Sequence, residues 1–458
     1  PQDPNARPKF HVKDLTCGEN DPNFPFFDEV HGLYHLMYQD HLSEPNGGDP
    51  GIAIGHVVSH DFVHWAHLPV SVWNDKPYDR VAIFTGSATI VDRQPFLVYP
   101  GLCVVGGEYT GCTTGMEYAQ AVPADAFDPL LTNWTKDARK GVRIARNPIL
   151  NATSDDPSTA WRTAHGEWRL VGNSLAKGQE DWTKAPIFAA SSFTGEWSLV
   201  GDSPFAAGEC PSHFPLPPLY PGTRATEAPL PTHVHKRGNG APGCAGDCMS
   251  LGTWVDGAPG EVGTWKATPG VAFSELLIDH GDYYASKDFN DTKYNRRINW
   301  GWAMTPGGAL SMARVLTYHP ELKQIVHSPA PEYDKLHGPA PLAQLGRTQL
   351  RAYSPLSLEG AARWADGVAN ASDVLVTFAR PNARCTFGLS VLQGAVSIFF
   401  EYTPPALADE GVGIVGVGIV DGPPPKPSPP VGTTGNGTCG STSYGGDCNA
   451  EPSGAWDA

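Results

Sequence analysis

Short apolar or aromatic runs, separated by turn residues, dominate the chain from about residue 20 to residue 320. The run at 32–39 alternates in the manner of a strand, and similar runs occur at 51–58, 81–90 and 167–172. Gly, Pro, Asn and Asp cluster between these runs, and few long amphipathic periods are present. The pattern predicts an all-β chain of many antiparallel strands, arranged as a sandwich, a barrel or a propeller.

The pattern changes twice toward the C-terminus. Residues 319–345 lack periodicity and contain several prolines, as is typical of an interdomain linker. Strand-like runs return at 374–379 and 395–402, and from Asp421 the chain becomes Pro-rich and then rich in Gly, Ser and Thr. We therefore expect a large β domain over residues 1–335, a smaller β domain over 336–420 and a disordered tail over 421–458.

Composition restricts the partners of this chain. The formal net charge is −16, which argues against binding nucleic acid or an anionic membrane through a general electrostatic field. No apolar run is long enough to span a bilayer. Pro1 opens a polar stretch, so a secreted form of this protein would be represented here by its mature chain. These features favour a soluble protein with a neutral small-molecule or oligosaccharide partner.

Cysteines and glycosylation sequons indicate the secretory pathway. The chain has 9 cysteines, none in a paired CxxC pattern, so neither a metal nor another cofactor is expected. Three pairs are close enough in sequence to close small disulfide loops, with connectivity left open: Cys103 and Cys112, Cys244 and Cys248, Cys439 and Cys448. Asn-x-Ser/Thr sequons begin at Asn133, Asn151, Asn290, Asn370 and Asn436. Together they favour an extracellular or secretory-pathway protein.

Three carboxylates beside prolines are the candidate catalytic groups: Asp21, Asp156 and Glu209. Asn20 and Asp21 precede a Pro-Asn pair, which alone is ordinary turn chemistry. Acids so far apart in sequence share one site only if the fold returns its strands to a common centre. A retaining glycosidase needs one ionised and one protonated carboxyl about 5–5.5 Å apart, and mutual repulsion of clustered acids raises a pKa. The adjacent Cys210 lacks a partner signature and is expected to be a buried structural thiol.

Eight segments resemble, in order, the conserved motifs of glycoside hydrolase family 32, which contains invertases, inulinases and plant fructosyltransferases. The family motifs WMNDPNG, YHLFYQ, FRDPTTAW and WECPDFFP have their counterparts at 18–24, 34–39, 154–161 and 208–215. The remaining matching segments are 54–69, 84–89, 283–289 and 296–302. Any one of these matches could arise by chance, whereas the ordered series is specific.

This resemblance implies a five-bladed β-propeller with an axial site, followed by a smaller β-sandwich that is short enough here to be truncated or divergent. It implies that Asp21 is the nucleophile, Glu209 the general acid and base, and Asp156 a transition-state stabiliser that holds two fructose hydroxyls. The expected substrate-binding residues are Asn20, Gln39, His64, Trp65, Phe84, Thr85 and Asp155. For Trp65 and Phe84, packing in the core is an equal alternative.

The function expected from the sequence is a secreted, retaining β-fructofuranosidase acting on sucrose or short fructans. The expected location is extracellular or in the secretory pathway, with the vacuole and the cell wall among the options. The protein would be a monomer or homodimer without a cofactor. A fructosyltransferase with sucrose as donor is an alternative, because Phe24 replaces the family glycine and the Trp of WMNDPNG is missing. A catalytically silent sugar-binding relative is another, because Asp155 stands where the family has arginine.

Overall fold

The computed structural model describes residues 10–14, 17–42, 51–105, 108–109, 112, 115–138, 143–144, 146–151, 154–174, 183–225, 229–238, 244, 246–269, 276–279, 281–305, 307–351, 356–357, 373–391, 396–405 and 414–421. The chain divides into two compact units, Pro1–Leu336 and His337–Ala458. Strands make up nearly all of the regular structure that is described. The first unit ends in a short 3₁₀ helix, η2 (Pro331–Leu336).

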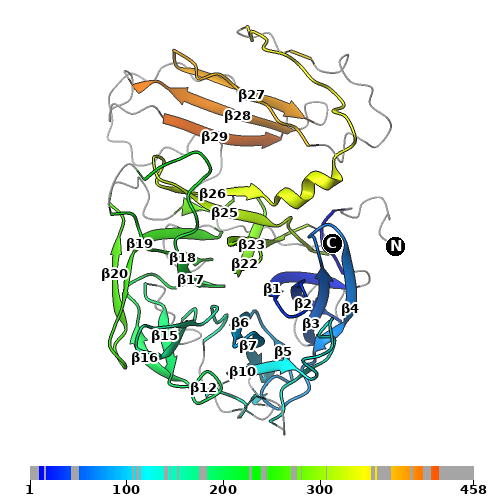
Figure 1. Cartoon of the computed structure of the whole chain (residues 1–458), viewed down its shortest axis with the longest axis vertical. Helices are drawn as coiled ribbons and strands as arrows, with labels where there is room; N and C mark the ends of the chain where they lie inside the picture. Colours follow the sequence, from blue (N-terminus) through cyan, green and yellow to red (C-terminus); the bar gives the residue numbers. More distant parts are fainter. Residues whose placement is uncertain are drawn as a thin grey trace. The chain divides into compact units, whose positions relative to one another are not determined.

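The first unit is built from five antiparallel meanders arranged around a common centre, each starting there and ending at the rim (Figure 1). Blade 1 contains β1 (Gly18–Asp28), β2 (Leu33–His41), β3 (Ile52–Ser59) and β4 (Trp65–Val72). Blade 2 contains β6 (Ser87–Val91), β7 (Gln94–Leu102), β10 (Met116–Pro123) and β11 (Trp134–Thr135). The short β5 (Ala82–Ile83) pairs with both β3 and β7, so blades 1 and 2 are joined into one sheet.

The three remaining blades repeat this order. Blade 3 contains β13 (Trp161–Arg162), β14 (Trp168–Val171), β15 (Pro186–Ala190) and β16 (Ser198–Asp202). Blade 4 contains β17 (Ser212–Pro215), β18 (His233–Arg237), β19 (Cys248–Asp256) and β20 (Gly263–Ala267). Blade 5 contains β22 (Tyr283–Asp291), β23 (Arg296–Ala303), β25 (Arg314–His319) and β26 (Gln324–Pro329). Short accessory strands are β8 (Val104–Val105), β9 (Glu108–Tyr109), β12 (Leu150–Asn151), β21 (Leu276–Leu277) and β24 (Ala309–Leu310).

Hydrophobic side chains fill the space between each pair of neighbouring blades. Every position of β2 and β3 is buried, because both faces of these strands are covered, whereas the rim strand β4 is largely exposed or half-buried. Five core clusters each join two consecutive blades. Representative pairs are Met37 and Leu97, Phe96 and Phe188, Ile187 and Trp254, Val234 and Leu316, Tyr34 and Trp300. This closed ring of cores makes the first unit a five-bladed propeller.

The segment ahead of β1 ties the last blade to the first. Leu310 of β24 donates its backbone N–H to the carbonyl of Val12 at 2.9 Å. The Val12 side chain is buried in the cluster shared by blades 1 and 5. Lys13 adds a bond from Nζ to the Gly307 carbonyl at 2.9 Å. The chain therefore closes the ring before its first strand begins.

The described part of the second unit is a three-stranded antiparallel sheet of β27 (Cys385–Val391), β28 (Val396–Thr403) and β29 (Ile414–Asp421). Phe387 and Phe400 stack across it, with ring centroids 5.5 Å apart. This sheet belongs to the smaller β-sandwich. The tail predicted after Asp421, with Cys439 and Cys448, lies outside the described residues. No helix among the described residues has the length and apolarity to cross a bilayer.

Candidate active site

The innermost segment of each blade brings one polar side chain to the centre of the propeller. Asp21 lies on β1, and Thr85 lies just before β6. Asp156 and Glu209 precede β13 and β17, and Lys287 lies on β22. The five residues are far apart in sequence, but the propeller assembles their segments around one axis (Figure 1).

Four of these inner segments bend at a residue in the left-handed region of backbone space. Phe24, Asp156, Cys210 and Ala285 have φ values of 46°, 51°, 49° and 51°. Such a conformation costs of order 1–3 kcal/mol at a non-glycine residue, so the surrounding packing must enforce it. The strand register also breaks near two of the bends, after Asn23 in β1 and after Tyr284 in β22. Irregularities of this kind change the direction in which neighbouring side chains point. Here the affected side chains are those at the centre of the propeller.

The Asp21 carboxylate is held by a chain of donors from blades 1 and 2. Its Oδ2 accepts a hydrogen bond from the Thr85 hydroxyl, and its Oδ1 accepts one from Asn20 Nδ2 at 3.1 Å. Gln39 Nε2 donates to Thr85 Oγ1 at 2.7 Å, so the hydroxyl proton is directed to Asp21. Burial raises the pKa of Asp21 to about 6, and the negative charge of Glu209 adds to this, while the Thr85 hydrogen bond opposes it.

Asp156 faces the same point from blade 3. It is 7% exposed, and its Oδ2 accepts the backbone N–H of Cys210 at 3.0 Å. The Cys210 sulfur lies 3.8 Å from Oδ2 of Asp156 and 3.8 Å from Oδ2 of Asp21. Burial raises the pKa of Asp156 to about 6, with the charge of Lys287 opposing and that of Asp21 adding to the shift. Two carboxylates therefore converge on one thiol.

The thiol of Cys210 is not equipped to act as a nucleophile. Burial raises its pKa well above the usual value, and the charges of Asp156 and Asp21 raise it further. The protonated form is thereby stabilised, whereas a nucleophilic cysteine needs its thiolate. Cys210 serves instead as a small buried group around which the carboxylates are arranged.

Glu209 is the third carboxylate of the cluster. Its side chain is half-buried, and its Oε2 accepts a hydrogen bond from the hydroxyl of Tyr284 on β22. Burial raises the pKa of Glu209, and the charge of Asp156 raises it further, while the Tyr284 hydrogen bond lowers it. The Glu209 carbonyl accepts the N–H of Gly238 at 2.6 Å, which fixes the main chain here. Glu209 thus has the surroundings of a proton donor.

A buried lysine balances part of this negative charge. Lys287 is 1% exposed, and its Nζ donates to Ser87 Oγ at 3.2 Å and to the Pro157 carbonyl at 3.4 Å. Its positive charge lowers the pKa of both Asp21 and Asp156. Burial in turn lowers the pKa of Lys287 itself. The carboxylates therefore keep part of their ionised character at a pH where burial alone would protonate them.

Three of the predicted substrate-binding residues lie at Asp21, and a fourth lies next to them in sequence. Asn20, Gln39 and Thr85 form the donor chain described above. Phe84 is half-buried and packs against the small cluster that contains Ile52. Asn20, Gln39 and Thr85 therefore adjoin the nucleophile candidate, whereas Phe84 shows the core packing that was the alternative for it.

The other predicted residues lie elsewhere or point to other partners. Trp65 begins the rim strand β4, where its Nε1 donates to the Phe62 carbonyl at 2.8 Å and its ring stacks on Phe62. This is the core packing that was the alternative for Trp65. His64 is exposed and pairs with Asp61 at 3.1 Å. Asp155 is half-buried beside Asp156, and its carbonyl accepts the Tyr118 hydroxyl at 3.0 Å.

Sequence reasoning assigned no role to Lys287 or Tyr284, although both lie in the matched segment 283–289. The available signal was a lysine within an otherwise apolar and aromatic strand. A lysine in such a position is buried only when nearby charges or acceptors compensate it. The sequence could not show that these acceptors come from blades 2 and 3.

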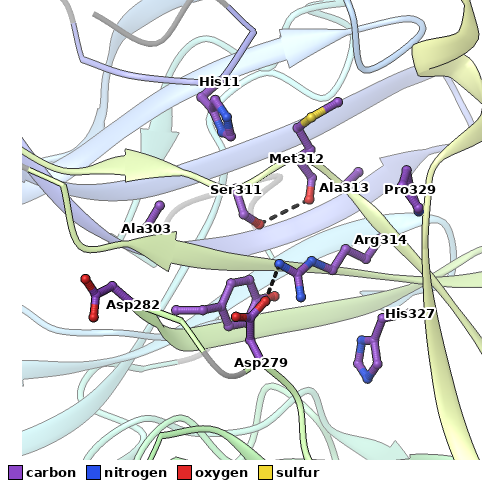
Figure 2. A pocket seen from close by; sticks show the side chains of 11 residues that line it. His11, Asp279, Asp282, Ala303, Ser311, Met312, Ala313, Arg314, His327 and Pro329 are labelled. Carbon is purple, nitrogen blue, oxygen red and sulfur yellow. Dashed lines mark hydrogen bonds and ion pairs between the residues drawn. The ribbon is translucent and has the colours of Figure 1, made fainter. Parts of the chain in front are cut away.

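A separate cavity of about 540 Å³ lies on blade 5 and contains none of the predicted site residues (Figure 2). Arg314 crosses it, pairing with Asp279 at 2.6 Å, with its guanidinium 4.3 Å from the Tyr283 ring centroid. Figure 2 shows His11 and His327 on opposite sides of this pair. Asp279 is thus neutralised by a direct ion pair, in contrast to the carboxylates at the axis, and Asp282 also lines the cavity.

The sequence of this chain matches the glycosyl hydrolases family 32 N-terminal domain over residues 11–315. The match begins ahead of β1 and extends into β25, so it includes all three carboxylates. The chain belongs to glycoside hydrolase family 32. The predicted family and fold class, a five-bladed propeller followed by a smaller β-sandwich, are both confirmed.

Relatives in family 32 include enzymes from plants. The chain is 30% identical over 317 residues to an insoluble-isoenzyme β-fructofuranosidase of Arabidopsis thaliana, covering 65% of this chain and 52% of the relative. It is 32% identical over 369 residues to a cell wall β-fructofuranosidase of Zea mays, covering 74% and 57%. The chain therefore spans about half the length of the curated relatives it matches. Fructan 1-exohydrolase IIa of Cichorium intybus has the same fold, with a TM-score of 0.61, 21% identity, and 91% and 86% of the two chains covered.

Proposed function

We propose that this protein is a retaining β-fructofuranosidase that cleaves the fructosyl bond of sucrose or short fructans. The observation that carries the proposal is the convergence of Asp21, Asp156 and Glu209 from three blades around Cys210, each with a raised pKa. Retaining glycosidases need two carboxyl groups in opposite protonation states on either side of the scissile bond. The donors Asn20 and Thr85 favour the ionised form of Asp21, and burial together with the charge of Asp156 favours the protonated form of Glu209.

In the first step, Asp21 attacks the anomeric carbon of the fructosyl unit and Glu209 gives its proton to the departing oxygen. The C–O bond to the leaving sugar breaks as the ester bond to Asp21 forms. Asn20 and Thr85 donate to both oxygens of Asp21, so they orient the carboxylate and favour its ionised form. Asp156 accepts hydrogen bonds from fructose hydroxyls and stabilises the oxocarbenium-like charge with its own negative charge.

In the second step, ionised Glu209 takes a proton from water, which attacks the anomeric carbon and releases Asp21. Fructose leaves with its original anomeric configuration, and both carboxyl groups return to their starting states. The Tyr284 hydroxyl bonded to Glu209 supports the ionised form that this half-reaction requires. One glutamate thereby acts as acid and then as base.

The substrate class rests on the relatives. They are named as β-fructofuranosidases of plants, and a second structure of the chicory enzyme contains 1-kestose, a fructose-terminated trisaccharide. The aromatic ring of Phe84 beside Thr85 supplies an apolar surface suited to a sugar face. Sucrose and short fructans are therefore the substrates to test first.

We also propose that the protein enters the secretory pathway. Disulfides join Cys103 to Cys112 and Cys244 to Cys248, bonds that persist in oxidising compartments. Of the sequon asparagines, Asn133, Asn151 and Asn290 are described, and all three are exposed, as attachment of a glycan requires. Asn370 and Asn436 lie outside the described residues.

The test is fructose release from sucrose, 1-kestose, inulin and levan by the purified chain, with Glu209→Gln and the exposed-site control Glu261→Gln alongside. Release that is lost only in Glu209→Gln supports the proposal, and NMR of the first product should show the β-anomer. Trisaccharide formation at high sucrose would instead indicate fructosyl transfer. Binding of these sugars by calorimetry without release would indicate a sugar-binding protein.

A further inference from the structure

A second cluster of acidic and thiol groups lies at the start of the propeller, with Asp40 buried and Asp14 and Cys17 half-buried. The carboxylates of Asp14 and Asp40 and the thiol of Cys17 offer ligand atoms that all lie within 4.8 Å of one another. Asp14 and Cys17 belong to the segment ahead of β1, while Asp40 lies on β2. None of the three takes part in the contacts of the axial carboxylates. The cluster therefore needs its own explanation.

The segment that carries two of these groups is held in a fixed conformation. The backbone N–H of Cys17 donates to Oδ1 of Asp14, and the Tyr38 hydroxyl donates to Oδ2 of Asp14 at 3.3 Å. The backbone N–H of Asp14 donates to Oε2 of Glu19. These bonds form a closed turn, and they place the Asp14 carboxylate against β2. The ligand atoms are thus positioned by main chain and side chains together.

The independent observation that points to a ligand is on Asp40. This residue is 4% exposed, and its Oδ1 is buried without any hydrogen-bond donor. Among the described residues, no lysine, arginine or histidine forms an ion pair with Asp40. Glu19, directly opposite Asp40 in the β1–β2 register, is 3% exposed and also has a buried oxygen without a donor, Oε1. A buried carboxylate oxygen without a donor is costly, and a bound cation removes that cost.

The donor set selects the cation. Mg²⁺ and Ca²⁺ prefer oxygen ligands throughout, so neither would use Cys17. Zn²⁺ accepts thiolate sulfur at about 2.3 Å and carboxylate oxygen at about 2.0–2.2 Å in a tetrahedral site, which separates such atoms by about 3.6 Å. The three ligand atoms all lie within 4.8 Å of one another, a separation of the same order. Two carboxylates and one thiolate leave a fourth position for water.

We propose that Asp14, Cys17 and Asp40 bind a zinc ion. On binding, the Cys17 thiol releases its proton to solvent, and a zinc–sulfur bond replaces the S–H bond without any change of oxidation state. The ion joins the segment that closes the ring, through Val12 and Lys13, to the second strand of blade 1. This site departs from the sequence expectation of no metal, because its ligands form no paired-cysteine motif.

Metal binding is tested on the full-length protein after treatment with a chelator. Calorimetry with Zn²⁺ should show one tight site, and Co²⁺ in its place should give a thiolate-to-cobalt charge-transfer absorption. Cys17→Ser should abolish that absorption, and Asp40→Asn should weaken zinc binding at least tenfold. Cys385→Ser, which removes the partly exposed thiol of the second unit, is the matched control and should change neither.

Alkylation followed by peptide mass spectrometry gives a test that needs no variant. Zinc should slow the labelling of Cys17 strongly and leave that of Cys385 unchanged in the same sample. The proposal is overturned if Cys17 is found in a disulfide, if zinc does not protect it, or if the cobalt spectrum survives in Cys17→Ser. If Asp40→Asn does not fold, the labelling of Cys17 in the unmodified chain still shows whether zinc binds there.

Discussion

Two clusters of acidic side chains with buried members occur in this protein, and the groups around them differ. At the propeller axis, Asp21 receives donors from Asn20 and Thr85, and Asp156 receives the Cys210 N–H. In the cluster ahead of β1, by contrast, Asp40 has a buried oxygen without a donor. Burial disfavours charge at both places.

The difference shows how the surroundings of a buried carboxylate indicate its use. Donors and the nearby charge of Lys287 leave the axial carboxylates ionisable near neutral pH, as proton transfer and nucleophilic attack require. A buried carboxylate oxygen without a donor, such as Oδ1 of Asp40, is a suitable ligand for a cation. We therefore propose catalysis at the axis and metal binding at the other cluster.

The largest expected effect is at the axis. Asp21→Asn and Glu209→Gln should each reduce fructose release by about 10³-fold or more, because one removes the proposed nucleophile and the other the proposed proton donor. Circular dichroism and the thermal midpoint should stay close to those of the unmodified protein. Asp40→Asn, in the other cluster, should lower the rate less than tenfold. A loss at Asp40 as large as that at Asp21 would mean that the two clusters are not functionally separate.

Much of this architecture could be predicted from the sequence. Alternating runs indicated an all-β chain, and the ordered motifs indicated a propeller, because side-chain periodicity and turn residues are local properties. The placement of Asp21, Asp156 and Glu209 at one centre followed from the same motifs. Each of these features is encoded in a short stretch of chain.

The contacts between blades could not be predicted. Trp65 matched the motif of a family site residue, yet it packs with Phe62 and Trp300 in the core between blades 1 and 5. Whether an aromatic side chain lines a site or fills a core depends on the neighbouring blade, which the local sequence does not specify. The burial of Lys287 between acceptors from other blades has the same origin.

Lys287→Met should have the next largest effect on fructose release, after the substitutions of Asp21 and Glu209. Without this buried charge, the pKa of Asp21 and of Asp156 rises, so a smaller fraction is ionised at a given pH. The acid limb of the rate profile should move upward by about one pH unit, and activity at pH 6 should fall roughly 10- to 100-fold. Lys136→Met is the matched control, because this buried lysine pairs with Asp79 at 2.7 Å and its charge is not among those that shift the pKa of Asp21 or Asp156. Equal shifts in the two variants would show that Lys287 has no special relation to the carboxylates.

Removal of the Thr85 hydroxyl should move the acid limb of the pH–rate profile in the same direction, but by less. The Thr85 hydroxyl stabilises the ionised form of Asp21 and so lowers its pKa, which burial has raised to about 6. Thr85→Val removes the donor, so the pKa of Asp21 rises and the acid limb of kcat/KM moves upward by about half a pH unit. Thr85→Ser keeps the hydroxyl and should leave the limb where it is. A profile unchanged in Thr85→Val would show that another group controls the limb.

The smallest effect concerns the stability of the metal-free protein. After zinc is removed, Asp40 remains a buried carboxylate without a donor for Oδ1, and Asp40→Asn replaces it with an uncharged group of nearly the same shape. The thermal midpoint of this variant, measured by calorimetry with a chelator present, should therefore be about 2 °C higher than that of the unmodified chain. Added zinc should reverse the order, because it stabilises only the chain that keeps all three ligands. At the axis, where donors already satisfy the carboxylates, Asp156→Asn should not raise the midpoint, and a rise there equal to that at Asp40 would remove the distinction between the two clusters.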